Sequence, residues 1–284
     1  MHPCGALAGG AASTRAAARS SRHAPGAVIG CAAPLSVPSR SSELPMTLDP
    51  SRVAAVVPAY NEAGKIGAVV RKISRQHAAC VFVVDDASAD GTAAEALAAG
   101  AERVLSHERN RGVGAAIRTG LFAAKREGFE IAVVLSGDDQ HEPEELPRLL
   151  EPLFAGRADL VQGSRWLPGG AVPGIPAQRR WLTRAYPWLF RIASGYPSTD
   201  GTNGLRAFRM SLLDDPRIRL DQPWLDRYEL EPYLLLQAVR CGYRVHEVPV
   251  TVRYHARGTT KMRLVRDGWR IVRPLFLLRL GLKR

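Results

Sequence analysis

Cysteine is scarce in this sequence, and long apolar runs are absent. The 284 residues contain four cysteines, which lie far apart and form no Cys-x-x-Cys pair, so no zinc site is expected. They are interpreted as free thiols in a reducing compartment, which favours a cytoplasmic location. No stretch of 18 or more apolar residues occurs, because the best candidate, 271–282, is short and is interrupted by Arg273, Pro274 and Arg279. A transmembrane helix is therefore not expected.

Acidic residues are nearly missing from the first fifty positions. Glu43 is the only acid before Asp49, and Ala, Ser, Arg, Gly and Pro dominate. The segment lacks the periodicity needed to bury a face, so residues 1–50 are predicted to form a disordered basic head. An Arg-rich transit peptide is a second interpretation, and it is less favoured. A third is a misassigned start, because Met46 stands just before the patterned sequence, which would leave residues 1–45 untranslated.

Positive charge is in excess over the chain as a whole. There are 39 Lys and Arg residues against 27 Asp and Glu residues, for a net charge of +12 and a pI of about 10.1. A field of this sign favours nucleotides, nucleic acid or an acidic membrane surface, without choosing among them. Much of the excess lies in the head and in the tail, and no nucleic-acid-binding motif occurs. Nucleic acid is therefore not an expected partner.

From Val53 onward, short β-branched runs alternate with segments of helical periodicity. Strands are predicted at 53–57, 80–86, 102–107, 131–136, 159–164 and 243–254. Helices are predicted at 66–73, 93–99, 115–127, 181–194 and 229–240. This alternation predicts an α/β fold with a mostly parallel central sheet, right-handed crossovers and flanking helices. We expect one such domain over residues 51–262, followed by a basic amphipathic helix over 263–284.

Three polar clusters directly follow predicted strands. They are PAYNE (58–62), DDASADGT (85–92) and GDDQH (137–141). Ligands of open α/β sheets bind at the carboxyl ends of the strands, so three clusters at one sheet edge indicate a binding site. The first offers an aromatic face and a carboxylate for a nucleobase, and the second places Asp86 where it can bind a base or a ribose. Taken singly, a helix cap and a turn explain these two clusters as well.

Residues 109–120 (RNRGVGAAIRTG) are rich in glycine and lead into a predicted helix. The glycines permit close approach to a phosphate, but tight packing of the helix on the sheet explains them equally well. A dinucleotide-binding fingerprint belongs after the first strand, whereas this segment follows the second helix. A dehydrogenase is therefore not favoured.

The third cluster contains oxygen ligands for a divalent cation. Asp138 and Gln140 suit Mg²⁺ or Mn²⁺ bridging a diphosphate, because magnesium often takes one or two carboxylates and completes its shell with phosphates and water. Such a cation stabilises charge on a departing nucleotide. Residues 142–144 also make a good first helical turn, and both interpretations hold together. His141 is interpreted as a support for the loop more readily than as a ligand.

Eight motifs occur in the order seen in family 2 glycosyltransferases. They are PAYNE (58–62), VVDDASADGT (83–92), NRGVGAAIRTG (110–120), GDDQHEPEE (137–145), GSRWLPGG (163–170), DGTNGLRAF (200–208), EVPV (247–250) and GTTKM (258–262). From about residue 53 to about residue 275 the chain resembles this family, and within it the dolichyl-phosphate or polyprenyl-phosphate mannose and glucose synthases. The resemblance implies a GT-A fold. It also implies inverting transfer of a hexose from a GDP-mannose or UDP-glucose type of donor to a polyprenyl phosphate.

Position by position, the resemblance also implies site residues. The nucleotide-sugar would contact Pro58, Tyr60, Glu62, Val84, Asp86, Gly137 and Asp138. The metal, Mg²⁺ or Mn²⁺, would lie on Asp138 and Gln140. Arg165 and Lys261 match basic positions that hold the diphosphate or the acceptor phosphate, and the catalytic set would be Asp138, Arg165 and Lys261. Arg257, which is not itself a matched position, is expected to help Arg165 and Lys261 hold the acceptor phosphate.

Two positions depart from the family pattern. The metal motif of the family is usually Asp-x-Asp, but Ser136 holds the first place. A Ser hydroxyl can ligate magnesium, yet lower metal affinity is expected, and a nucleotide-sugar-binding relative with weak or no catalysis is an alternative. The Arg of the synthases falls on His255, with Arg253 and Arg257 on either side of it.

The residues needed for catalysis depend on the acceptor. A phosphate monoester is largely a dianion at neutral pH, so its oxygen attacks without a strong base, and alignment and cations suffice. A sugar hydroxyl, the alternative acceptor, needs a carboxylate base. Asp226, Glu229 and Glu231 are the candidates, with Glu229 preferred. The polar first turn of a helix explains these three acids as well.

The basic tail raises a membrane hypothesis. Residues 263–284 interleave Arg and Lys with Trp269, Leu275 and Phe276. This composition fits an interfacial helix on an anionic bilayer, and it fits a helix packed on the core with a solvated basic face equally well. The expected location is the cytoplasm, and peripheral contact with the cytoplasmic face of the membrane follows from the first of these two interpretations.

Overall fold

The structure, a computed structural model, describes residues 49–254 and 264–283. The basic head predicted over residues 1–50 therefore lies outside the described residues, apart from its last two positions. Arg257 and Lys261 also lie outside them, as does His255.

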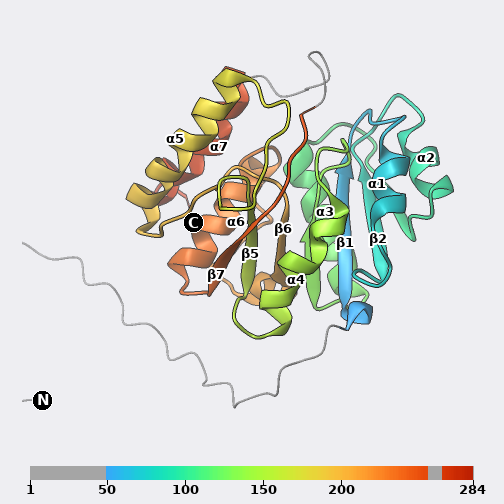
Figure 1. The fold of residues 1–284 in the computed structure, drawn as a ribbon, viewed down its shortest axis with the longest axis horizontal. Coiled ribbons are helices and arrows are strands. Elements are labelled where there is room, and N and C mark those ends of the chain that lie inside the picture. Colours follow the sequence, from blue (N-terminus) through green and yellow to red (C-terminus); the bar gives the residue numbers. More distant parts are fainter. Residues whose placement is uncertain (1–48, 255–263, 284) are drawn as a thin grey trace, which may run out of the picture. The chain divides into compact units, whose positions relative to one another are not determined.

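Within the described ranges, seven strands form one sheet (Figure 1). They are β1 (Val53–Ala59), β2 (Cys80–Asp85), β3 (Arg103–Ser106), β4 (Ile131–Val134), β5 (Leu160–Ser164), β6 (Arg206–Arg209) and β7 (Val245–Pro249). Their order in the sheet is β3-β2-β1-β4-β6-β5-β7. The strand β6 runs antiparallel to β4 and β5, and the remaining neighbours are parallel. The predicted mostly parallel sheet is confirmed.

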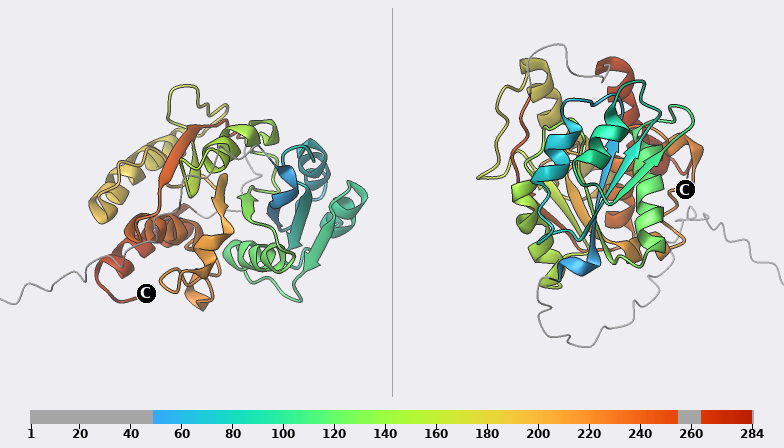
Figure 2. Two further views of the ribbon diagram at one scale, coloured as in Figure 1. Left: turned by 90° about the horizontal axis from the view of Figure 1, so that it is seen from below. Right: turned by 90° about the vertical axis from the view of Figure 1, so that its right-hand side faces the viewer.

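Helices cover both faces of the sheet (Figures 1 and 2). They are α1 (Ile66–Lys72), α2 (Thr92–Ala98), α3 (Val113–Arg126), α4 (Leu146–Phe154), α5 (Ala177–Ser194), α6 (Leu230–Arg240) and α7 (Leu264–Arg279). Short 3-10 turns lie at Pro50–Arg52, Pro143–Glu145, Met210–Asp214 and Pro223–Leu225. One face of the sheet shares a hydrophobic core with α1, α2 and α4, and the other face shares a second core with α3, α5, α6 and α7.

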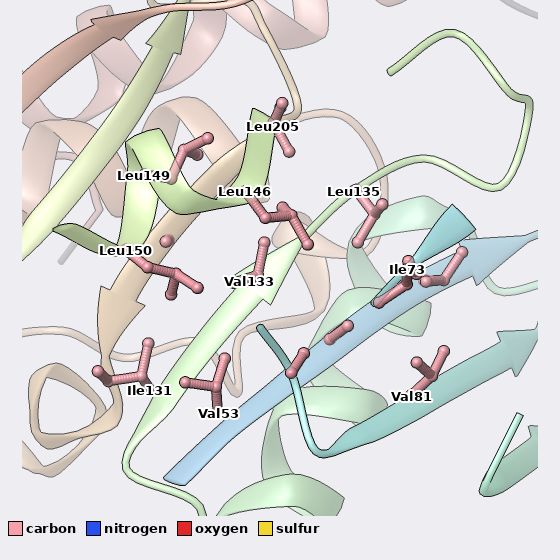
Figure 3. Close-up of a cluster of buried hydrophobic side chains, with 14 of the residues drawn as sticks. Val53, Ile73, Val81, Ile131, Val133, Leu135, Leu146, Leu149, Leu150 and Leu205 are labelled. Atoms are coloured by element: carbon pink, nitrogen blue, oxygen red, sulfur yellow. The ribbon is translucent and has the colours of Figure 1, made fainter. Parts of the chain in front are cut away.

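Figure 3 shows part of the first core, where side chains of α4 share one cluster with side chains of β1 and β4. The helix contributes Leu146, Leu149 and Leu150, whose spacing of three and four residues places them on one face. Val53 and Val133 of the strands belong to the same cluster, and none of the five is measurably exposed. Burying a side chain of this size contributes roughly 1.5–3 kcal/mol, so this packing fixes the helix that follows the third polar cluster.

The strand β6 was not predicted, and it occupies the middle of the sheet between β4 and β5. It has four residues, with Arg206 and Arg209 at its ends, so it shows no apolar alternation. Because β6 is antiparallel to its neighbours, its first residue pairs with Val134 at the carboxyl end of β4. The loop at 200–205 therefore reaches the same sheet edge as the three polar clusters.

Candidate functional site

A cleft of about 390 Å³ opens at the carboxyl edge of the sheet. Its walls include seven of the sequence-predicted ligands: Pro58, Tyr60, Glu62, Asp86, Asp138, Gln140 and Arg165. Among the described residues that line it, Val84 and Gly137 do not occur. Val84 is fully buried in β2, and the backbone N–H of Gly137 donates to Pro58 O at 3.3 Å. The fold thus gathers the three clusters into one cleft.

Asn61 links the first two clusters through hydrogen bonds. This residue has a left-handed backbone, with φ of 51°, and its Oδ1 accepts a hydrogen bond from Ala89 N at 2.8 Å. Its own backbone N–H donates to Ser88 Oγ at 2.8 Å. The interlocked loops hold Tyr60 on the cleft wall with 38% of its surface exposed, which places an aromatic side chain at the cleft.

Asp86 organises the loop that follows β3. It is 2% exposed, and its carboxylate accepts hydrogen bonds from the backbone N–H of Arg111 at 2.8 Å and of Gly112 at 2.7 Å. His107 Nδ1 lies 2.7 Å from the same carboxylate. These hydrogen bonds occupy much of the accepting capacity of the Asp86 carboxylate. Its contact with a nucleotide stays a prediction.

Packing accounts for the glycines of 109–120. A Cβ on Gly114 would lie 2.0 Å from the carbonyl oxygen of Leu225, and a Cβ on Gly120 would lie 2.5 Å from Val56 Cγ1. Gly112, with φ of 108°, caps the N-terminus of α3. Close approach of α3 to the sheet and to the loop at 225–227 therefore requires these small residues, in line with the second of the two interpretations.

The turn after β4 brings Ser136, Asp138 and Gln140 to the cleft. Asp138 Oδ1 accepts a hydrogen bond from Gln140 N at 3.2 Å. His141 Nδ1 accepts from Ser136 N at 3.1 Å, which leaves Nε2 to donate to Asn203 Oδ1 at 3.0 Å. Burial lowers the pKa of His141. The ring is therefore neutral, and with both nitrogens engaged it supports the turn, as the sequence favoured.

Toward the cleft, the same turn offers the carboxylate of Asp138, the hydroxyl of Ser136 and the amide oxygen of Gln140. Oxygen donors of these kinds are the ligands that Mg²⁺ and Mn²⁺ prefer. Within residues 49–254 and 264–283, no group of three or more His, Cys, Asp or Glu side chains gathers at a spacing that would hold a metal ion. The donor set therefore fits a divalent cation whose shell is completed by phosphates and water.

Arg165 is paired with Asp200 in the wall of the cleft. Asp200 accepts hydrogen bonds from Arg165 Nε at 2.6 Å and from Nη2 at 2.7 Å. Arg165 Nη2 also donates to Thr202 Oγ1 at 2.5 Å, and Nη1 donates to Tyr254 Oη at 2.6 Å. Burial opposes the charge of the guanidinium, but the Asp200 carboxylate outweighs it and raises the pKa of Arg165. Sequence reasoning missed Asp200, although it opens the motif at 200–208.

One of the three candidate bases lines the cleft, and it is Glu231. Asp226 is paired with Arg118 at 2.5 Å. Glu229, which the sequence favoured, is 2% exposed and is paired with Arg273 at 2.8 Å. Burial raises the pKa of Glu229. Because Glu229 does not line the cleft, the structure replaces it by Glu231 as the candidate base.

Known proteins resemble the chain over most of its length. The profile described as Glycosyl transferase family 2 matches residues 54–215. Polyprenol monophosphomannose synthase from Mycolicibacterium smegmatis is 35% identical over 232 residues, which cover 78% of this chain and 85% of the relative. Undecaprenyl-phosphate mannosyltransferase from Micrococcus luteus is 35% identical over 216 residues, which cover 74% of this chain and 87% of the relative.

A solved structure shares the fold. The crystal structure of glucosyl-3-phosphoglycerate synthase from Mycobacterium tuberculosis, in complex with phosphoglyceric acid, matches with a TM-score of 0.63 and 24% identity. The match covers 82% of this chain and 81% of that one, and it supports the predicted GT-A fold. Given the profile match over more than half of the chain and the two relatives, the chain belongs to glycosyl transferase family 2 and is a glycosyltransferase.

Proposed function

We propose that this glycosyltransferase moves a hexose from a nucleoside-diphosphate sugar to a polyprenyl phosphate, with inversion at the anomeric carbon. One observation carries the proposal: the three polar clusters expected to bind the nucleotide line the same cleft as the cationic side chains of Arg179, Arg227 and Arg266. A donor diphosphate and an anionic acceptor need this combination. The names of the two bacterial relatives, a polyprenol monophosphomannose synthase and an undecaprenyl-phosphate mannosyltransferase, support the choice of acceptor.

The donor would lie along the carboxyl ends of β1, β2 and β4. Its base would stack on Tyr60, and Glu62 and Asp86 would hydrogen-bond to the nucleoside. Pro58 would contact it from the cleft wall, whereas Val84 and Gly137 are not among the described residues that line the cleft. The donor is of the GDP-mannose or UDP-glucose type, and a transfer assay with GDP- and UDP-hexoses decides between them.

Asp138, with Ser136 and Gln140, would hold Mg²⁺ or Mn²⁺ against the donor diphosphate. When bound, such a cation supplies positive charge for the departing diphosphate. The fold-related synthase from Mycobacterium tuberculosis was solved with Mn²⁺ and UDP in one crystal structure and with Mg²⁺ and UDP in another, which supports a divalent cation here.

In the reaction, an oxygen of the acceptor phosphate forms a bond to the anomeric carbon while the bond from that carbon to the donor diphosphate breaks. The nucleoside diphosphate leaves with the bonding electrons. The acceptor phosphate is largely a dianion at neutral pH, so no proton has to be removed. Catalysis then depends on alignment and on cations. Arg165, Arg257 and Lys261 would hold the acceptor, and of these three the structure describes Arg165.

A sugar hydroxyl is the alternative acceptor, and the position of Glu231 favours it. This carboxylate lines the cleft and lies 3.6 Å from Arg206 Nη2. It would serve as the general base that a hydroxyl acceptor needs. A nucleotide-sugar-binding protein with weak catalysis is a further alternative, which rests on Ser136.

A transfer assay tests the proposal. The purified full-length chain is incubated with GDP- and UDP-hexoses, Mg²⁺ or Mn²⁺, and a short-chain polyprenyl phosphate. Lipid-linked sugar is expected, and Asp138→Ala should abolish it. The matched control is Asp139→Ala in the same turn, whose carboxylate pairs with Lys72 at 2.7 Å. Donor hydrolysis without transfer would show that the acceptor is not a polyprenyl phosphate. Absence of donor binding would overturn the whole proposal.

A further inference from the structure

Helices α5 and α7 pack against each other (Figures 1 and 2). Several large apolar side chains of the two helices are exposed. We call this set the α5–α7 face, and it consists of Trp181 (71% exposed), Trp188 (67%) and Ile192 (61%) of α5, with Trp269 (57%) and Phe276 (48%) of α7 and Leu280 (68%) just after it. Both helices carry these residues at intervals of seven and four, which places them on one side of each helix. Single exposed apolar residues are normal, but a group on two neighbouring helices marks an interaction surface.

The charges beside this face are positive. The helix α5 contains no acidic residue, and its exposed charged residues are Arg180, Arg184 and Arg191. The helix α7 contains one acid, Asp267, which is 1% exposed and is paired with Arg270 at 3.0 Å. The exposed charged side chains of both helices are therefore arginines, which complement an anionic surface.

The same two helices line the cleft. Arg179 of α5 is part of the cleft wall and lies over the ring of Tyr254, 5.2 Å from its centroid. Arg266, Arg270 and Ile271 of α7 also belong to that wall. An anionic surface in contact with the two helices would therefore lie next to the cations of the cleft.

We propose that the α5–α7 face binds an anionic lipid bilayer at the depth of its headgroups. Trp and Phe side chains prefer this interface, and Arg side chains bind the anionic headgroups. A lipid acceptor then enters the cleft from the membrane past the N-terminal turns of α5 and α7, where Arg179 and Arg266 line it, a step that rests on the proposed function. Within residues 49–254 and 264–283, no helix combines the length and apolarity needed to cross a bilayer.

Vesicle sedimentation of the full-length chain tests the docking surface. Vesicles contain phosphatidylcholine alone or phosphatidylcholine with phosphatidylglycerol. Binding is expected to the anionic vesicles and to weaken with added salt. The double variants Trp181→Ala/Trp188→Ala and Trp269→Ala/Phe276→Ala should each weaken binding by roughly tenfold or more. Arg180→Gln and Arg191→Gln should each weaken it by about fivefold.

The matched controls are Leu97→Ala on α2 and Phe122→Ala on α3, which are 65% and 39% exposed and should bind vesicles as the unaltered chain does. Equal binding by the double variants would overturn the proposal. Self-association that is lost in those variants, without vesicle binding, would assign the face to a second copy of the chain. Binding of GDP or UDP in the absence of lipid reports separately on the proposed function, and the double variants should leave it unchanged.

Discussion

Asp200 accepts hydrogen bonds from both Nε and Nη2 of Arg165, and neither residue is more than 5% exposed. The pair ties the residue after β5 to the loop that leads into β6. Removing one member of a buried ion pair leaves the other charge without compensation, which typically costs about 3–5 kcal/mol. The wall of the cleft therefore depends on Asp200 for its shape as well as for its charge.

Asp200→Asn is expected to lower the free energy of unfolding by about 3–5 kcal/mol, because it leaves the buried Arg165 guanidinium without its counter-charge. Denaturant unfolding measures the change. Asp214→Asn is the control, since its carboxylate pairs with Lys125 but is 68% exposed, and a loss below about 1 kcal/mol is expected. Similar losses for the two variants would contradict the structural role assigned to Asp200.

Gly114→Ala and Gly268→Ala are expected to change stability in opposite directions. A Cβ on Gly114 would lie 2.0 Å from a backbone oxygen of Leu225, whereas nothing lies within 4 Å of a Cβ on Gly268. Overpacking at Gly114 should cost about 1–3 kcal/mol or more. Alanine at Gly268, inside α7, should stabilise the helix by up to about 1 kcal/mol. Thermal unfolding compares the two variants. If Gly114→Ala left the stability unchanged, packing would not explain the glycines of 109–120, and the phosphate-binding interpretation would be favoured instead.

The parallel strands were predictable because their evidence is local. The run at 80–84 is apolar throughout, as strands buried on both faces are, and β2 spans Cys80–Asp85. The strand β6 gave no such sign. Its Arg206 is 1% exposed and donates to the carbonyl oxygens of Glu231 and Asn203. Distant parts of the chain satisfy this buried arginine, and no local pattern shows them.

The site residues, too, were predictable only where the evidence for them is local. The rule that ligands bind at the carboxyl ends of strands correctly brought the three clusters together. The choice between Glu229 and Glu231 needed the tertiary structure. Two positions apart on a helix differ by about 200° in direction, so one carboxylate reaches the cleft and the other reaches Arg273 of α7. Sequence alone does not tell which side of α6 the cleft occupies.

Ser136→Asp is expected to raise the affinity for Mn²⁺ in the presence of a nucleoside diphosphate, on the order of tenfold, because affinity rises with the number of charged oxygen ligands. Calorimetry measures the binding without any need for turnover. Ser136→Ala serves as the control, and it should bind Mn²⁺ no better than the unaltered chain. If aspartate at this position left the affinity unchanged, the cation would not lie on the turn after β4.

Glu231→Gln separates the two acceptor classes. A phosphate acceptor needs no general base, so the proposed function predicts a kcat within about tenfold of the unaltered enzyme. A hydroxyl acceptor predicts a loss of about 10²–10⁴. Melting temperatures are compared alongside, because the variant also removes the ion pair between Glu231 and Arg206. Glu229→Gln is the matched control two residues away, and it should not change the rate under either hypothesis.

The pH profile of the same variant gives a second readout. With a phosphate acceptor, the rate should fall as the pH decreases through roughly 6, where the acceptor gains a proton. That fall belongs to the substrate, so it should persist in Glu231→Gln. With a hydroxyl acceptor, the fall at acidic pH belongs to the base and should vanish with it. If the pH profile flattens in Glu231→Gln and kcat falls strongly, the acceptor is therefore a hydroxyl group and not a lipid phosphate.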